Sequence, residues 1–183
     1  MLRPKKQTKP KIKHRPFLKW AGGKFRLTDD INKTFPKKKQ CLIEPFVGAG
    51  AVFLNSNFER YILADINPDL INLFNIVKEN VDDYIEACKP IFFAEEANSA
   101  GYYYAKRQQF NDSQDPFERS VLFLYLNRFG FNGLCRYNSK NEFNVPFGAY
   151  KTHYFPEDEL RYFAHKAQNA VFLCGDFQQT FEL

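Results

Sequence analysis

Several features common in proteins of other classes are missing from this 183-residue sequence. No apolar run approaches the roughly 20 residues of a membrane-spanning helix, and the N-terminus lacks the apolar segment of a signal peptide. The cysteines lie far apart and form no Cys-x-x-Cys pair, which disfavours a structural metal site; they are Cys41, Cys88, Cys135 and Cys174. We therefore expect a cytoplasmic protein with reduced thiols that binds no metal and no membrane.

Acidic residues are absent from the first 15 positions, which carry seven Lys or Arg. The rest of the chain has 19 basic and 21 acidic residues, so the net charge of +5 comes from this segment. Pro4 and Pro10 interrupt it, and we expect residues 1–14 to form a disordered basic tail. Such a tail either only solubilises the chain or holds a polyanion without reading its sequence, with salt-dependent affinity.

The rest of the composition, 44% hydrophobic and 26% charged, is typical of a globular domain with a real core. Apolar runs predict buried strands at 41–46, 61–65 and 170–174. Apolar periodicity and N-cap signals predict helices at 25–35, 51–57, 68–78, 82–93, 99–110, from 116 onward and at 156–168. Residues 130–150 are rich in Asn, Gly and aromatic residues, and 136–138 and 143–145 predict a β-hairpin.

The most informative segment joins the first two expected strands. The first strand leads into the turn Gly48-Ala49-Gly50, a helix follows, and the second strand ends at Asp65. This order is the first half of a βαβ unit, whose turn lets a ligand approach the backbone and whose acid can hold a ribose. The alternative is a plain glycine turn without a ligand, because one glycine motif is a weak signal.

The glycines that are missing narrow the choice of ligand. A dinucleotide-binding turn needs a third glycine three residues after Gly50, where this chain has Phe53. A phosphate-binding loop around Gly22-Gly23-Lys24 lacks its first glycine and the Ser or Thr after its lysine. What remains is a nucleoside-like ligand with a ribose for Asp65 and no phosphate, a description that S-adenosylmethionine fits.

Several segments, in this order, resemble the Dam-type DNA adenine methyltransferases of the D12 class. They are Arg15–Lys24, Glu44–Gly50, Ala64–Asn67, Leu126–Asn138 and Phe143–Gly148. The resemblance covers about residues 15–177 and implies an α/β, Rossmann-like S-adenosylmethionine-dependent methyltransferase domain, incomplete at its C-terminus. It implies that 15–66 and 161–183 form this domain and that 67–160 form an inserted, mostly helical DNA target-recognition module with a β-hairpin.

The resemblance implies methyl transfer from S-adenosylmethionine to N6 of adenine in double-stranded DNA, in a GATC site. The cofactor contacts that it carries over are Trp20, Lys24, Glu44, Phe46, Asp65, Asp176 and Phe177. Trp20 offers a cation–π contact to the sulfonium, and Lys24 can hold the methionine carboxylate or a nearby acid. Asp65 would accept from the ribose hydroxyls and Asp176 from the adenine amino group. Without the resemblance, Trp20 could also be interpreted as a core residue and Asp176 as a helix cap.

The DNA contacts implied by the resemblance are Lys19, Arg128, Phe131, Asn132, Leu134, Arg136, Pro146, Tyr150 and Lys151, with Asn127 a phosphate or scaffold contact. Arg136 can donate two bonds to a guanine edge, and Leu134 and Pro146 can pack on a thymine methyl. Phe131 would fill the gap left by a flipped adenine, with Asn132 beside it. Without the family, such a cluster also reads as a solvated hairpin. Ala149 replaces the family's arginine before the tyrosine, which weakens phosphate anchoring.

The family places adenine N6 with an Asp-Pro-Pro-Tyr loop that would follow Phe177, and this sequence contains no Pro-Pro pair. We therefore expect a truncated methyltransferase, inactive alone, with a partial sheet, an open edge and a possible separate C-terminal catalytic segment. The alternatives are a catalytically dead GATC-DNA or cofactor-binding regulator and a polyanion or RNA binder that uses the tail. Such bacterial or phage-like, nucleoid-associated enzymes serve mismatch repair, DNA replication or restriction–modification.

Overall fold

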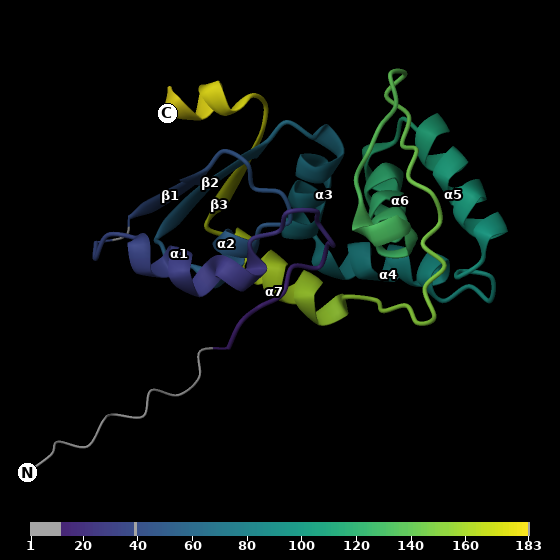
Figure 1. Ribbon diagram of the computed structural model, residues 1–183, viewed down its shortest axis with the longest axis horizontal. Coiled ribbons are helices and arrows are strands. Elements are labelled where there is room, and N and C mark those ends of the chain that lie inside the picture. The colour runs from purple at the N-terminus through teal and green to yellow at the C-terminus, as the bar shows by residue number, and fades with distance from the viewer. Residues whose placement is uncertain (1–11, 39, 183) are drawn as a thin grey trace, which may run out of the picture.

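A computed structural model describes residues 12–38 and 40–182, and its centre is a sheet of three parallel strands (Figure 1). The strands are β1 (Cys41–Glu44), β2 (Arg60–Asp65) and β3 (Ala170–Cys174), in the order β1-β2-β3. The register aligns Ile43 with Ile62 and Ile62 with Val171. Because parallel neighbours need crossover connections, this arrangement confirms the α/β fold and the βαβ order predicted from the turn.

The helices that cover one face of the sheet are α2 (Ala51–Asn55), α3 (Pro68–Glu79) and α7 (Glu157–Ala167) (Figure 1). The core between them and the sheet is aromatic. Phe163 stacks on Phe172 of β3 with ring centroids 5.7 Å apart, and Phe74 lies 4.7 Å from Phe163. Phe53 meets Tyr61 of β2 edge to face at 4.9 Å. Burial of each such ring stabilises the fold by about 1.5–3 kcal/mol, so this layer fixes the strand ends that carry the site.

The opposite face of the sheet is open among the described residues. Ile43 is 43% exposed and Val171 55% exposed, although the register places them on either side of Ile62. The prediction that these strands are buried is therefore wrong for this face, and Cys174, expected in a buried strand, is exposed. The prediction of a partial sheet without one of its helix layers is confirmed.

The second half of the molecule is helical and contains α4 (Val81–Phe92), α5 (Ala100–Asp112) and α6 (Pro116–Phe129) (Figure 1). Helix α6 packs on α3, α4 and α5, and nearly all its residues from Ser120 to Phe129 are buried. Asp115 caps the first turn of α6, which it was predicted to open, and Ser99 caps α5, one residue before the helix begins at Ala100. Helix α3 packs on the sheet as well as on α6, so it joins the two halves.

The remaining short elements are α1 (Thr28–Thr34) and three 3₁₀ turns, η1 (Phe25–Leu27), η2 (Phe131–Gly133) and η3 (Phe177–Phe181). The predicted helix at 25–35 is thus η1 followed by α1. The predicted hairpin is reduced to one antiparallel bridge between Tyr137 and Phe143, supported by a bond from Asn144 N to Arg136 O of 3.0 Å. Asn138 accounts for the short ladder, because its side chain accepts the backbone N–H groups of Lys140 and Glu142.

The basic tail expected at 1–14 falls mostly on residues 1–11, which lie outside the described residues. Its last two positions differ from the expectation of disorder. Lys13 pairs with Asp29 at 2.7 Å, and the His14 ring stacks on Tyr162 with centroids 3.5 Å apart. Asn55 donates to His14 O and accepts from His14 N, both at 2.9 Å, so the chain is fixed to the body from residue 13.

Two features are absent from residues 12–38 and 40–182, the part of the chain that the structure describes. No helix there has the length and apolar character to cross a membrane. No group of three or more His, Cys, Asp or Glu side chains lies close enough together to hold a metal ion.

Candidate functional site

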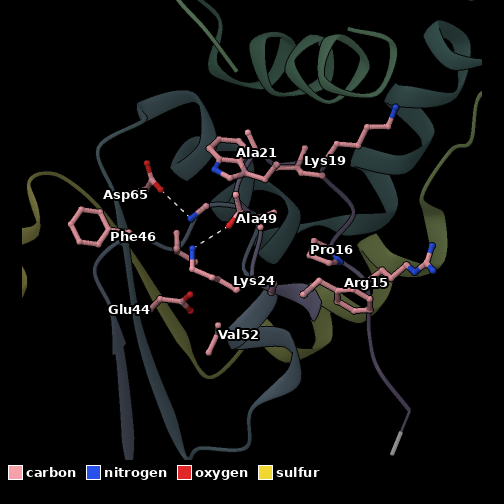
Figure 2. Close-up of a pocket in the computed structure, with 18 of the residues that line it drawn as sticks. Arg15, Pro16, Lys19, Ala21, Lys24, Glu44, Phe46, Ala49, Val52 and Asp65 are labelled. Atoms are coloured by element: carbon pink, nitrogen blue, oxygen red, sulfur yellow. Dashed lines mark hydrogen bonds between the residues drawn. The ribbon is translucent and has the colours of Figure 1, made fainter. Parts of the chain in front are cut away.

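A cavity of about 1100 Å³ opens where β1 and β2 end (Figure 2). Most of its wall comes from the segments 15–26 and 44–52, and the rest includes Ile31, Phe35 and Leu42, Asp65 at the end of β2 and Arg128 near the end of α6. In open α/β sheets, ligands bind at the carboxyl ends of the strands, where loops leave a crevice between neighbouring elements. The position of this cavity is therefore the one predicted from the strand–turn–helix pattern.

The turn after β1 is fastened to the end of β2. Val47 N donates to Ala64 O at 2.8 Å, and Gly48 N donates to Asp65 Oδ2 at 3.0 Å. The other carboxylate oxygen, Asp65 Oδ1, accepts from Asn67 N at 3.1 Å. These bonds fix the orientation of the Asp65 carboxylate, and each oxygen keeps lone-pair capacity for another donor. A hydroxyl donor in the cavity would therefore meet a preoriented acceptor.

Gly48 lets the Trp20 ring lie directly on this turn. The residue has a φ of +48°, a left-handed conformation that side chains disfavour, and a Cβ there would lie 2.9 Å from Trp20 Cδ1 and Nε1. Gly23 N donates to Trp20 O at 3.1 Å, which closes the turn around the indole. Trp20 is part-buried, packs against the core and lines the cavity. Its contact with a cofactor stays a prediction.

Glu44 brings a buried, incompletely satisfied carboxyl group to the cavity. Its Oε2 atom is buried and has no hydrogen-bond partner among the described residues. Burial raises the pKa of the carboxyl to about 7, against the opposing effects of a backbone hydrogen bond from Phe53 and the charge of Lys24. Lys24 itself donates to Gly22 O at 3.1 Å (Figure 2). A buried acceptor without a donor is uncommon and costly, so this atom indicates a ligand group that donates.

The structure brings together at this cavity the predicted cofactor residues Trp20, Lys24, Glu44, Phe46 and Asp65. Asp176 and Phe177 do not line it. Asp176 Oδ1 accepts from Gln178 N at 2.9 Å and so caps η3, which is the alternative reading of this residue. The Phe177 ring lies 5.5 Å from that of Phe46, which lines the cavity, and both side chains are exposed.

Lys19 connects the cavity wall with the helical half. Its Nζ donates to Arg128 O at 2.9 Å and lies 3.8 Å from the centroid of the Tyr150 ring. Burial, together with the nearby charge of Arg128, lowers the pKa of this amine to about 8. Gly133, with a φ of +60°, leaves room for the Lys19 side chain, because a Cβ there would lie 2.1 Å from Lys19 Cβ.

Arg128 and Asn127, adjacent on α6, have different roles. The Arg128 guanidinium lies 5.4 Å from the centroid of Tyr154, its Nε is buried without a partner among the described residues, and burial lowers its pKa. Asn127 is buried and bonds to both backbone groups of Lys19, at 2.9 and 2.7 Å. Asn127 is therefore a scaffold contact, one of the two roles predicted for it, and Arg128 is available to an acceptor.

The other predicted DNA contacts lie on the loop from residue 130 to residue 151. Phe131 is 48% exposed, and Asn132, Arg136, Pro146 and Lys151 are exposed as well. Arg136 donates from Nε to Asn144 Oδ1 at 2.7 Å and from an Nη atom to Asn144 O at 3.1 Å. Leu134 is half-buried against the core.

The structure also contains a cluster of functional groups that motif reading missed. Asp69, Arg119, Tyr137, Cys135 and Asn67 link the loop after β2 to the hairpin and α6. The only signal in the sequence was Asp69, an acid in the first turn of a helix that is otherwise apolar on its buried side. An acid at such a position usually only complements the helix dipole.

The comparisons with known proteins agree with one another. Residues 20–183 match the family model described as D12 class N6 adenine-specific DNA methyltransferase. The chain is 87% identical over 183 residues to a DNA adenine methylase of Haemophilus influenzae, which covers 100% of this chain and 64% of that protein. It is 63% identical over 168 residues to the DNA adenine methylase of Escherichia coli K12, covering 92% of this chain and 60% of the relative. A DNA adenine methylase of Vibrio cholerae is 57% identical over 169 residues, with coverage of 92% and 60%. The chain thus spans less than two thirds of the length of these relatives.

Proposed function

The chain belongs to the D12 class of N6 adenine-specific DNA methyltransferases, and we propose that its cavity binds the methyl donor S-adenosylmethionine. The observation that carries the proposal is the buried Oε2 atom of Glu44, a residue that lines the cavity, which has no hydrogen-bond donor among the described residues. S-Adenosylmethionine has an ammonium group that donates, ribose hydroxyls that donate and a sulfonium that attracts an aromatic face. The residues of the cavity offer an acceptor or a ring for each of these groups.

The proposed contacts follow from the chemistry of the side chains. Glu44 accepts from the methionine ammonium, while Lys24, whose charge acts on Glu44, pairs with the methionine carboxylate. Asp65, held by two backbone N–H groups, accepts from the ribose hydroxyls. The Trp20 ring, pressed against Gly48, offers its face to the sulfonium. When bound, the cofactor supplies an electrophilic methyl group.

We propose double-stranded DNA as the partner of residues 67–160, and GATC as the site. Arg136 stands exposed with its guanidinium oriented by Asn144, which suits a two-bond contact to a guanine edge. Exposed Pro146 and half-buried Leu134 provide the apolar contact for a thymine methyl. Lys151 and Arg128 are proposed phosphate contacts. In this picture Ala149 contributes no charge to phosphate anchoring.

The proposed reaction is methylation of adenine N6, whose lone pair is delocalised into the ring. The target base has to leave the duplex before it can meet the methyl group, and exposed Phe131 can occupy the gap. The described residues supply the cofactor cavity and the recognition surface, and none of them is assigned to positioning N6. A bacterial cytoplasmic location at the nucleoid follows from the proposed substrate.

Equilibrium binding tests this function. We expect the chain to bind S-adenosylhomocysteine, the product form of the cofactor, and to bind a GATC duplex more tightly than one with a changed guanine pair. We expect Asp65→Asn, which removes the proposed ribose acceptor, to weaken cofactor binding. A wild-type chain that bound no cofactor analogue, or that bound both duplexes equally, would overturn the proposal.

A further inference from the structure

The loop that carries the proposed ribose acceptor is joined directly to the hairpin that carries the proposed base contact. Residues 65–69 lead from the end of β2 into the first turn of α3. Two side chains of this short segment, Asn67 and Asp69, reach residues 135 and 137, which flank Arg136. Residues 65–69 therefore connect the two proposed binding sites. Neither the proposed cofactor contacts nor the proposed DNA contacts use the bonds that Asn67 and Asp69 make to the hairpin.

Asp69 makes the stronger of the two connections. It is 8% exposed, and its carboxylate accepts from Arg119 Nε at 2.9 Å and from an Arg119 Nη atom at 3.0 Å. Asp69 Oδ2 also accepts from the Tyr137 hydroxyl at 2.6 Å. Burial, together with the Asp69 charge, raises the Tyr137 pKa, so this hydroxyl remains a donor. A bond from a hydroxyl to a buried carboxylate is a strong one, and it holds the hairpin strand against α3.

Asn67 makes the second connection. Its Nδ2 donates to Cys135 Sγ at 3.2 Å, while its Oδ1 accepts from Leu70 N at 3.1 Å and caps α3. Its backbone N–H donates to Asp65 Oδ1 at 3.1 Å. Asn67 therefore touches the proposed cofactor acid on one side and the hairpin on the other.

The hairpin itself is weakly held by its own ladder. It has the single bridge between Tyr137 and Phe143, and its exposed Arg136 contacts Asn144 within the same hairpin. The second strand of the hairpin is held by Asn111, which bonds to both backbone groups of Phe143, and by Arg107, which donates to Val145 O. The strand that carries Arg136 is bonded to the rest of the protein through Tyr137 to Asp69 and through Cys135 to Asn67. A change in the order of residues 65–69 would be passed directly to the orientation of Arg136.

We infer that Asp69 and Tyr137 form a joint that couples cofactor binding at Asp65 to base recognition by Arg136. The inference rests on the proposed function and adds to it a positioning role for two residues that touch neither ligand. Cofactor bound at Asp65 holds the 65–69 loop, the loop holds the hairpin, and the hairpin presents Arg136 to DNA. Because coupling between two binding sites is reciprocal, DNA strengthens cofactor binding by the same factor.

The test measures this factor in the wild-type chain and in Tyr137→Phe, which removes the hydroxyl and leaves the Asp69–Arg119 pair. S-Adenosylhomocysteine is titrated with and without saturating GATC duplex, and the duplex with and without the analogue. We expect a coupling factor of about fivefold or more in the wild type and below about twofold in the variant. The affinity for the analogue without DNA should not change. Tyr125→Phe is the matched control, because it also removes a buried hydroxyl bond, that to Ala97 O of 2.6 Å, on α6.

A wild-type factor of one, or a Tyr137→Phe factor equal to that of the wild type, would overturn the inference while leaving the proposed function intact. Absence of binding of both ligands by the wild type would overturn the proposed function and the inference with it. Thermal unfolding checks that Tyr137→Phe folds. Should it not fold, Cys135→Ala removes the second connection, and its coupling factor should lie below that of the wild type; an unchanged factor would contradict the joint.

Discussion

Glu44→Gln tests whether the buried carboxyl group serves a ligand. The variant keeps the shape of the side chain but removes its charge. With a pKa of about 7, the wild-type carboxyl is about nine-tenths protonated at pH 6 and about one-tenth at pH 8. Because the proposed ammonium contact needs the carboxylate, wild-type affinity for S-adenosylhomocysteine should rise about tenfold from pH 6 to pH 8. The variant should bind more weakly at pH 8 and lose this dependence.

The same substitution should act on stability in the opposite direction. The folded pKa of about 7 lies above the ordinary value of 4.5, so the folded chain holds this proton more tightly than the unfolded chain does. Wild-type stability is therefore lost as the pH rises through the window from 4.5 to 7, by at most about 3 kcal/mol. Glu44→Gln avoids this loss, so without ligand the variant should be more stable than the wild type at pH 8.

Calorimetric titration at pH 6, 7 and 8 and denaturant unfolding at pH 8 provide the two measurements. Glu95→Gln, which removes the same charge from an exposed position, is the control and should match the wild type in both. The account of Glu44 would be refuted by a variant that binds the cofactor analogue as tightly as the wild type at pH 8. It would also be refuted by wild-type affinity that does not change between pH 6 and pH 8.

Three further substitutions test other parts of the account. Gly48→Ala should weaken cofactor-analogue binding at least tenfold in calorimetry, because it costs about 1–2 kcal/mol of backbone strain and places a methyl group 2.9 Å from the Trp20 ring. Arg136→Ala should cost about 1–3 kcal/mol of GATC-duplex affinity in a mobility-shift titration and relax specificity at one base pair. Asp69→Asn should lower the free energy of unfolding by up to about 3–5 kcal/mol in denaturant titration, because Arg119 loses its buried partner.

Each of these substitutions has a control. Gly101→Ala changes a helical glycine with no heavy atom near its Cβ position, and should leave cofactor binding unchanged. Lys140→Ala removes a charge from the exposed hairpin tip and should not relax specificity. Asp30→Asn breaks an exposed pair with Lys33 and should not shift the unfolding midpoint. Equal effects in a variant and its control would contradict the corresponding assignment.

The elements could be predicted from the sequence because their signals are local. The continuous apolar run of β3 predicted its bounds, Ala170–Cys174, and the Asn67 and Asp115 caps predicted the starts of α3 and α6. The predicted strand at 41–46 ends earlier, at Glu44, where Pro45 interrupts the ladder. Apolar strands predict a sheet that is covered on both faces. The exposed face could be predicted only from the expectation that one helix layer is missing.

In the candidate site, too, features formed by residues close in sequence could be predicted, and features formed by distant residues could not. The turn and Asp65 belong to one motif and could be predicted together. The contact of Trp20 with Gly48 joins residues far apart in the chain, and it required packing that no pattern encodes. The bonds of Asp69 to Arg119 and Tyr137 span 50 and 68 residues, so they follow only from the way α3 lies against α6 and the hairpin. The contacts of a side chain could thus be predicted only where the residue that it contacts lies near it in the sequence.

Trp20 allows the central claim, that S-adenosylmethionine occupies this cavity, to be tested directly. It is the only tryptophan in the sequence and it lines the cavity, so its fluorescence reports on what binds there. The decisive measurement is a titration of Trp20 emission with S-adenosylhomocysteine, in the wild type and in Asp65→Asn. The account predicts a saturable change that is shifted to much higher concentration in the variant and is absent with a dinucleotide. No change in the wild type, or the same curve in both proteins, would contradict it.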